Sequence, residues 1–236
     1  MLELGGKNAL IAFPDADLEA VSAAVVDGMN FTWCGQSCGS TSRAFVHEKI
    51  YDAVLERVKN SIKRYKPGIP TDPATTMGSI ISQVQYDRVH GLHRGRQAGR
   101  RAAASAAASG RAIRISPRAS SSSRRYLPTS PWTCASARRR SSGPILSIFK
   151  WSDEDKMLAQ VNQVEYGLTC SIWTNDLVTA HRTAAAVEAG FVWINEVSKH
   201  FLGAPFGGYK QSGVGREEGI EELHAASRAR RTSTSI

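Results

Sequence analysis

The chain holds a cysteine among small residues and a carboxylate upstream, a pairing that can perform nucleophilic chemistry on a carbonyl group. Cys38 lies in residues 35–41, Gly-Gln-Ser-Cys-Gly-Ser-Thr, where an incoming carbonyl can approach a thiolate. Glu3 opens residues 3–7, Glu-Leu-Gly-Gly-Lys. The thiolate is the nucleophilic form of cysteine, and a nearby carboxylate can take protons during turnover. A lone cysteine is more often a buried small hydrophobe, so the flanking motifs carry the argument.

A third block, residues 205–213 (Pro-Phe-Gly-Gly-Tyr-Lys-Gln-Ser-Gly), runs into Gly-Arg-Glu at 215–217. Together the three blocks resemble the NAD(P)-dependent aldehyde dehydrogenase superfamily, whose signatures include Glu-Leu-Gly-Gly-Lys and Gly-Gln-x-Cys. The spacing from Glu3 to Cys38 suits that family. The resemblance is close over residues 1–89 and 143–223. It implies a C-terminal fragment with most of the catalytic domain and without the N-terminal Rossmann-type half.

The resemblance also implies a mechanism, NAD(P)-dependent oxidation of an aldehyde to a carboxylate. Cys38 would attack the aldehyde to give a thiohemiacetal, and hydride loss to NAD or NADP would leave a thioester. The backbone N–H of Cys38 would form half of the oxyanion hole. Glu3 would activate the water that hydrolyses the thioester. A packing cysteine and a surface carboxylate at a strand end are the structural alternatives.

Four further residues receive roles from the resemblance. Leu4 and Gly5 are expected beside the nicotinamide. Phe206 is expected to line the aldehyde pocket, and a plain core phenylalanine is the alternative. Glu217 resembles a carboxylate on the proton exit path, and a solvated glutamate at a helix end is the alternative.

The remaining polar and small residues are assigned structural roles. Cys34 and Cys170 are interpreted as packing residues, and Asn195 as a cap or loop stabiliser. Gly207 and Gly208 fit a tight turn that needs positive φ. The histidines show no metal spacing, so no metal is implied. Four irregularly spaced cysteines argue against a disulfide framework, and we expect a reduced, cytoplasmic protein.

The formal net charge of +9 comes from two segments. Residues 90–142 hold twelve arginines and no Asp, Glu or Lys, and residues 224–236 hold three more arginines and no acid. Without these 15, the other 15 basic residues face all 21 acidic ones, a balance of −6. The charge is therefore no general sign of nucleic-acid binding. Single-strand binders need stacking aromatics interleaved among their basic residues, and the arginines of these segments are not interleaved with aromatics in this way. No apolar run is long enough to span a bilayer, and the N-terminus does not resemble a signal peptide.

The arginine-rich segments are interpreted as family sequence translated in a shifted reading frame. Residues 90–97 can be encoded so that translation from one base later gives Met-Gly-Tyr-Ile-Glu-Ala-Gly. The opposite shift turns residues 138–142 into Glu-Glu-Ile-Phe, which resembles the cofactor-ribose loop of the family. Arg140 and Ser142 stand where that glutamate and phenylalanine belong, so both contacts are lost. A disordered linker and a nucleic-acid-binding arm are the alternatives. A verified DNA sequence without shifts near codons 89, 105, 142 and 223 would overturn the interpretation.

The elements that must position these residues alternate along the chain. Strand-like and helix-like periodicities predict an α/β fold with a mainly parallel sheet flanked by helices. Strands are expected over residues 8–14, 43–47, 145–149, 167–173 and 191–194, and helices over 17–30, 50–65, 153–161 and 177–189.

The sequence thus predicts an oxidoreductase fragment in four parts. Residues 1–89 and 143–223 form the catalytic domain, 90–142 is anomalous, and 224–236 is an altered tail. The expected partner is a small aldehyde, with no nucleic acid and no membrane, and the parent protein is expected to be a homo-oligomer. As the fragment lacks its cofactor half, we expect little or no dehydrogenase activity. A non-catalytic, decayed homologue and a basic nucleic-acid-binding module are the alternative functions.

Overall fold

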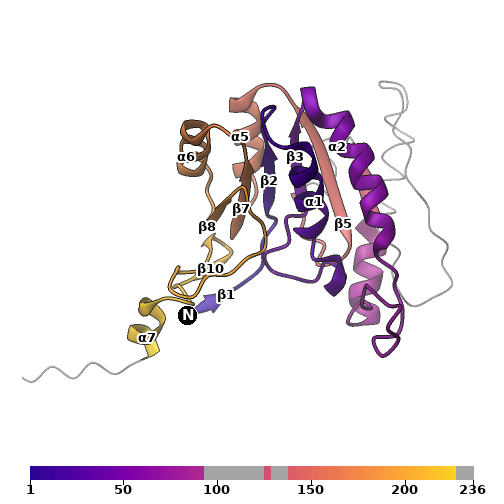
Figure 1. Cartoon of the computed structure of the whole chain (residues 1–236). Helices are drawn as coiled ribbons and strands as arrows, with labels where there is room; N and C mark the ends of the chain where they lie inside the picture. Colours follow the sequence, from indigo (N-terminus) through magenta and orange to yellow (C-terminus); the bar gives the residue numbers. More distant parts are fainter. Residues whose placement is uncertain (93–124, 129–137, 227–236) are drawn as a thin grey trace, which may run out of the picture.

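The computed structural model describes residues 1–92, 125–128 and 138–226 (Figure 1). Its centre is a six-stranded sheet in which every adjacent pair is parallel. The predicted α/β fold with a mainly parallel sheet is therefore confirmed. In spatial order the strands are β4 (Arg125–Pro128), β5 (Ile145–Trp151), β3 (Arg43–His47), β2 (Ala9–Ala12), β7 (Thr169–Trp173) and β8 (Phe191–Ile194).

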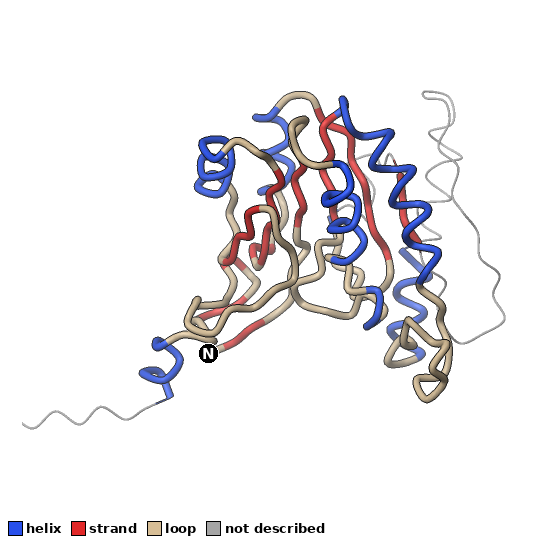
Figure 2. Tube along the Cα trace, viewed as in Figure 1, coloured by secondary structure: helices blue, strands red, loops and turns tan. Residues whose placement is uncertain are grey.

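Helices cover both faces of this sheet, so its central strands are buried on both sides (Figure 2). Helices α1 (Leu18–Asp27) and α2 (Glu48–Ser61) pack on the face to which Leu10 of β2 belongs. Helices α5 (Glu154–Asn162) and α6 (Leu177–Ala186) pack on the other face, with Ile11. Neighbouring strand residues point to opposite faces, so one continuous apolar strand serves two core clusters.

Aspartates start three of these helices. The side chains of Asp17, Asp153 and Asp176 accept hydrogen bonds from the first-turn N–H groups of α1, α5 and α6. The predicted helix ends run too far: α1 stops at Asp27, and α6 stops at Ala186. α2 begins at Glu48 and continues as a 3-10 turn, η2 (Ile62–Arg64). These differences lie at element ends, where apolar periodicity carries least information.

Small elements pair segments that are far apart in sequence. β1 (Leu2–Glu3) pairs antiparallel with β10 (Gly213–Val214), and β6 (Tyr166–Gly167) pairs with β9 (Tyr209–Lys210). Figure 1 shows β1 and β10 side by side below the main sheet, with α7 (Ile220–Ala226) beyond them. A helix also spans residues 83–92. Within the described ranges, no helix is both long and apolar enough to cross a lipid bilayer.

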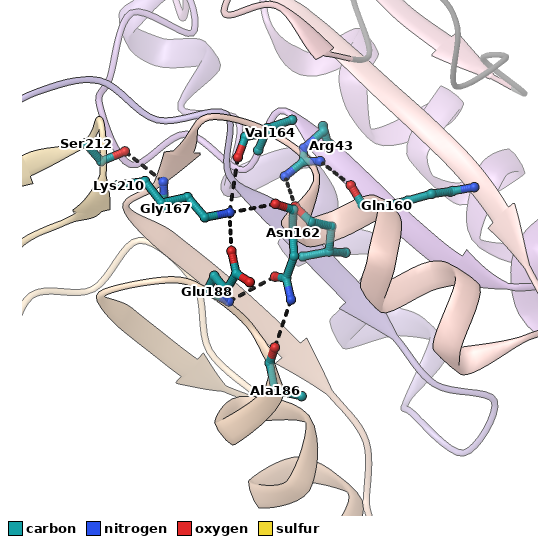
Figure 3. Close-up of polar contacts among 10 residues, drawn as sticks. Arg43, Gln160, Asn162, Val164, Gly167, Ala186, Glu188, Lys210 and Ser212 are labelled. Carbon is teal, nitrogen blue, oxygen red and sulfur yellow. Dashed lines mark hydrogen bonds and ion pairs between the residues drawn. The ribbon is translucent and has the colours of Figure 1, made fainter.

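Two cations hold the end of α5, as Figure 3 shows. Arg43, 2% exposed, donates to the carbonyls of Lys7 (2.8 Å), Gln160 (3.2 Å) and Val161 (3.0 Å). Lys210 donates to the carbonyls of Asn162 and Val164 and pairs with Glu188. Carbonyls in the last turn of a helix lack partners within the helix. A positive charge there is also stabilising, because the C-terminal end of the helix dipole is partly negative. Burial lowers the pKa of Arg43 to about 10, yet the guanidinium stays charged at neutral pH.

Replacing Arg43 tests how much this junction stabilises the fold. Arg43→Met should lower the free energy of unfolding by about 3 kcal/mol, because three carbonyls, two of them in buried contacts, lose a donor at roughly 1 kcal/mol or more each. Arg57→Met is the control, since Arg57 is 45% exposed in a surface ion pair with Glu19. It should change the value by less than about 0.5 kcal/mol. Urea unfolding followed by tryptophan fluorescence measures both, and equal effects would contradict the assigned role.

Candidate active site

The loop that carries Cys38 is shaped by glycine and by side-chain contacts. It follows a 3-10 turn, η1 (Phe31–Trp33), and enters β3. Gly35 has φ +66°, and a Cβ there would lie 2.6 Å from the Gly143 carbonyl oxygen, so only glycine fits. Gln36 ties the loop to the segment before the 83–92 helix: it donates to Ser79 O at 3.1 Å and accepts from Ile81 N at 2.9 Å.

Two side chains from neighbouring strands hold the backbone of this loop. The Asn8 amide nitrogen donates to the Cys38 carbonyl at 2.7 Å and to the Ser40 carbonyl at 3.1 Å. The Thr169 hydroxyl donates to the Gly39 carbonyl at 3.3 Å. Asn8 precedes β2 and Thr169 begins β7, so the amino ends of two adjacent parallel strands fix three successive carbonyls of the loop.

Glu3 lies beside Cys38, although 34 positions separate them in sequence. The pairing of β1 with β10 sets Glu3 opposite Gly213. Burial raises the pKa of the half-buried Cys38 thiol, and the charge of the Glu3 carboxylate and its hydrogen bonding to the thiol raise it further. Oε1 of Glu3 is buried with no hydrogen-bond partner among the described residues. The structure thus brings the two predicted catalytic residues together, with the thiol held in its protonated form at neutral pH.

Serine 212 joins the first and third sequence blocks. Its hydroxyl donates to the Gly5 carbonyl at 2.7 Å, and its own carbonyl accepts from Leu4 N at 3.0 Å. The same hydroxyl oxygen accepts from Gly167 N at 3.0 Å. The motif serine is therefore a buried structural link that sets β1, and with it Glu3, against the sheet.

Phe206 and Glu217 face each other in an isolated antiparallel bridge, and their N–H and carbonyl groups exchange two hydrogen bonds of 2.8 Å. Burial raises the pKa of Glu217, and the charges of Glu3 and two neighbouring glutamates add to the shift. Glu217 therefore lies in the field of Glu3. Phe206 is 1% exposed and packs against Phe191 and His200, so its ring belongs to an aromatic cluster.

Leu4 and Gly5, the predicted neighbours of a nicotinamide, have different surroundings. Leu4 is 47% exposed. Gly5 is covered by Arg140: a Cβ on Gly5 would lie 1.7 Å from a guanidinium nitrogen. Arg140 also donates to Ser142 Oγ at 2.7 Å, and its Nη1 is buried with no partner among the described residues. A guanidinium only donates hydrogen bonds, so this loop does not fit a ribose diol in the way that a carboxylate would.

Gly207 and Gly208 lie in the third sequence block and pack closely against its other residues. The prediction of positive φ at Gly207 and Gly208 is wrong, since positive φ between residues 203 and 215 falls on Gly203, Lys210, Gly213 and Gly215. Glycine is needed there for close approach instead: a Cβ on Gly207 would lie 2.6 Å from the Gly215 carbonyl oxygen, and one on Gly208 would lie 2.4 Å from Ser212.

The polar and cysteine assignments agree with the contacts. Asn195 binds both backbone groups of Thr174, accepting from its N–H at 3.1 Å and donating to its carbonyl at 2.9 Å, as expected of a loop stabiliser. Cys34 and Cys170 are buried and form no disulfide bond among the described residues, and burial raises the pKa of Cys170 to about 12. In residues 1–92, 125–128 and 138–226, no three His, Cys, Asp or Glu side chains converge as a metal site.

The sequence motifs did not point to Asn8 or Thr169. The only sequence signal for Asn8 is that a polar residue stands directly before an apolar strand, next to the Gly-Gly-Lys of a motif. Thr169 resembles any strand threonine. Their contacts depend on strand pairing, which local sequence does not state.

Comparison with known proteins identifies the family. The aldehyde dehydrogenase family model matches residues 1–232, and the chain belongs to that family. Aldehyde dehydrogenase tropH of Talaromyces stipitatus is 46% identical over 234 residues, covering 95% of this chain and 44% of the relative. A betaine aldehyde dehydrogenase of Brucella melitensis is 37% identical, covering 94% of this chain and 45% of the relative. The chain thus spans under half the length of these curated relatives.

Solved structures agree with the family. The NAD-dependent aldehyde dehydrogenase of Sinorhizobium meliloti superposes with a TM-score of 0.85 at 32% identity, covering 96% of this chain and 44% of that one. The NAD+ complex of the Bacillus cereus aldehyde dehydrogenase gives a TM-score of 0.83 at 30% identity, covering 94% and 44%. At these scores the similarity extends to the arrangement of the whole described sheet.

Alkylation tests the environment of the candidate nucleophile. Iodoacetamide should modify Cys38 well before the buried Cys34 and Cys170, and its rate should still rise as the pH passes 9, because the pKa of Cys38 is raised. Peptide mapping by mass spectrometry, over a series of pH values, follows each cysteine separately. A Cys38 rate that levels off below pH 8 would contradict the assigned burial and the charge of Glu3.

Proposed function

We propose that this chain is the catalytic-cysteine part of an aldehyde dehydrogenase, with Cys38 as nucleophile and Glu3 as general base. The observation that carries the proposal is the proximity of the Glu3 carboxylate to the Cys38 thiol, across a long sequence separation and within the family's own motifs. The proposed substrate of the whole protein is a small aldehyde, which it oxidises to a carboxylate. The proposed whole protein is a cytoplasmic homo-oligomer.

The first step belongs to Cys38. Glu3 accepts the thiol proton, and the sulfur attacks the aldehyde carbon. The carbonyl electron pair moves to oxygen, which takes up a proton and gives a thiohemiacetal. Backbone N–H groups of the 38–39 segment lower the pKa of the thiol, so they stabilise negative charge at this position. In the whole protein, NAD or NADP would supply the hydride acceptor that takes the thiohemiacetal to the thioester level.

The last step belongs to Glu3. Its carboxylate takes a proton from a water molecule as that water attacks the thioester carbonyl, and the Cys38 thiolate leaves. The products are a carboxylate and a free enzyme thiol. Glu217, within the electrostatic field of Glu3, is the proposed next acceptor for the proton. Phe206 remains a proposed pocket residue whose ring, held by its aromatic neighbours, would give the pocket a rigid wall.

Substituting Glu3 separates the two steps of this chemistry. Glu3→Gln should speed alkylation of Cys38 at pH 8, because removing the charge lowers the pKa of the thiol. The same variant should slow hydrolysis of an activated ester such as p-nitrophenyl acetate by roughly 100-fold, the usual contribution of a general base. Glu19→Gln, at an exposed position on α1, is the matched control and should change neither rate. Parallel changes in the two rates of Glu3→Gln would argue against the proposed roles.

The chain itself should show little dehydrogenase activity. Arg140 covers Gly5, a residue expected beside the nicotinamide, and the chain spans about 44% of the length of its relative. Incubation with NAD or NADP and a panel of aldehydes should give no NADH or NADPH absorbance above a Cys38→Ala control. The ester assay on the same sample serves as the check that Cys38 is competent. Robust cofactor reduction would refute this prediction.

A further inference from the structure

Asn8 is bound at both ends of its amide, so its orientation is fixed. It is 3% exposed. Its nitrogen donates to the carbonyls of Cys38 and Ser40, and its Oδ1 accepts from the Thr169 N–H at 3.1 Å. Rotating the amide would break all three bonds and leave buried polar groups unpaired.

The neighbouring glycine makes room for this side chain. A Cβ on Gly6 would lie 2.1 Å from Oδ1 of Asn8, inside any allowed contact. The glycine directly before Lys7 in the first motif therefore permits the Asn8 amide to take its place beside the Cys38 loop.

Holding the Cys38 carbonyl has a consequence for the next N–H. A trans peptide is planar, and its C=O and N–H point in opposite directions. With the Cys38 oxygen held 2.7 Å from Asn8, the N–H of Gly39 in the same peptide faces away from Asn8. The Gly39 N–H hydrogen-bonds the Cys38 sulfur and lowers the pKa of the thiol, which opposes burial and the charge of Glu3.

We propose that Asn8 is a positioning residue for Cys38: by holding the Cys38 carbonyl, it aims the Gly39 N–H at the sulfur and stabilises the thiolate. This inference rests on the proposed function, in which Cys38 is the nucleophile. Asn8 acts through the backbone and need not contact the substrate.

The test is the pH profile of Cys38 alkylation in the full chain carrying Asn8→Ala. The midpoint should move to higher pH, and the rate at pH 8 should fall roughly tenfold, the effect of one pKa unit. A purely structural role predicts the opposite sign, because a loosened loop would expose the sulfur and separate it from Glu3. An unchanged midpoint, or one that moves to lower pH, overturns the proposal.

Two further variants sharpen this result. Gly6→Ala should displace the Asn8 amide and move the midpoint in the same direction as Asn8→Ala. Asn195→Ala is the matched control, since Asn195 likewise uses both ends of its amide on backbone groups. These are the N–H and carbonyl of Thr174, beyond the carboxyl ends of β7 and β8 at the opposite edge of the sheet. It should leave the Cys38 midpoint unchanged.

Cys34 and Cys170 report whether each variant is folded, because both are buried and should stay unmodified. Cys134, which lies outside the described residues, is replaced by serine throughout. If Asn8→Ala unfolds, the proposal is tested instead by following the Gly39 amide resonance against pH in the chain with Asn8 intact. The chemical shift of this amide should change with the same midpoint as Cys38. A Gly39 amide whose shift does not change with pH overturns the proposal. Failure of Cys38 to titrate in the chain with Asn8 intact would instead count against the proposed function.

Discussion

The buried amide of Asn8 joins the three segments on which the site depends. It stands at the start of β2 and binds the Cys38 loop on one side and the start of β7 on the other. The arrangement follows from the parallel sheet, because the amino ends of adjacent parallel strands meet at one edge. The loop before β3 lies at this edge as well, so its backbone can be fixed by side chains from both neighbouring strands. A shift in the pairing of β2 and β7 would separate Asn8 from Thr169.

Electrostatics then sets the state of the nucleophile. Burial and the charge of Glu3 favour the protonated thiol, while N–H groups of the loop favour the thiolate. The balance keeps the thiol protonated at neutral pH, next to the carboxylate that can accept its proton. The nearby Glu217, whose pKa is also raised, shows that the charge of Glu3 extends to the 205–217 block. The three sequence motifs therefore act on one another through charge and backbone contacts.

Local sequence predicted those features that depend on neighbouring residues. Asp17 and Asp153 start helices because a side-chain oxygen can reach the next free N–H groups, and the run Arg-Ala-Phe-Val-His forms β3 over the predicted residues. The motifs identified Cys38 and Glu3 as candidates. Local sequence gave no sign of the β1–β10 and β6–β9 pairs or of the Asn8 contacts, because these depend on segments many residues apart. The expected positive φ at Gly207 failed for the same reason: close packing against the Gly215 carbonyl, and no turn, requires glycine there.

The arginine-rich middle of the chain, residues 90–142, contacts the first sequence block. Arg140 occupies the space beside Gly5. The hypothesis that residues 90–142 are translated in a shifted frame stays a prediction. The β4 strand nonetheless comes from this segment and pairs with β5. The proposed catalytic residues, Glu3 and Cys38, lie outside this segment, and Arg140 contacts the first block at Gly5.

The central claim is that Cys38 adds to aldehydes, and carbon NMR with an aldehyde labelled with ¹³C at its carbonyl carbon tests it most directly. A thiohemiacetal resonance is expected with the unsubstituted chain, and it should be lost in Cys38→Ser. A spectrum without that resonance, or one in which the signal persists in Cys38→Ser, would contradict it.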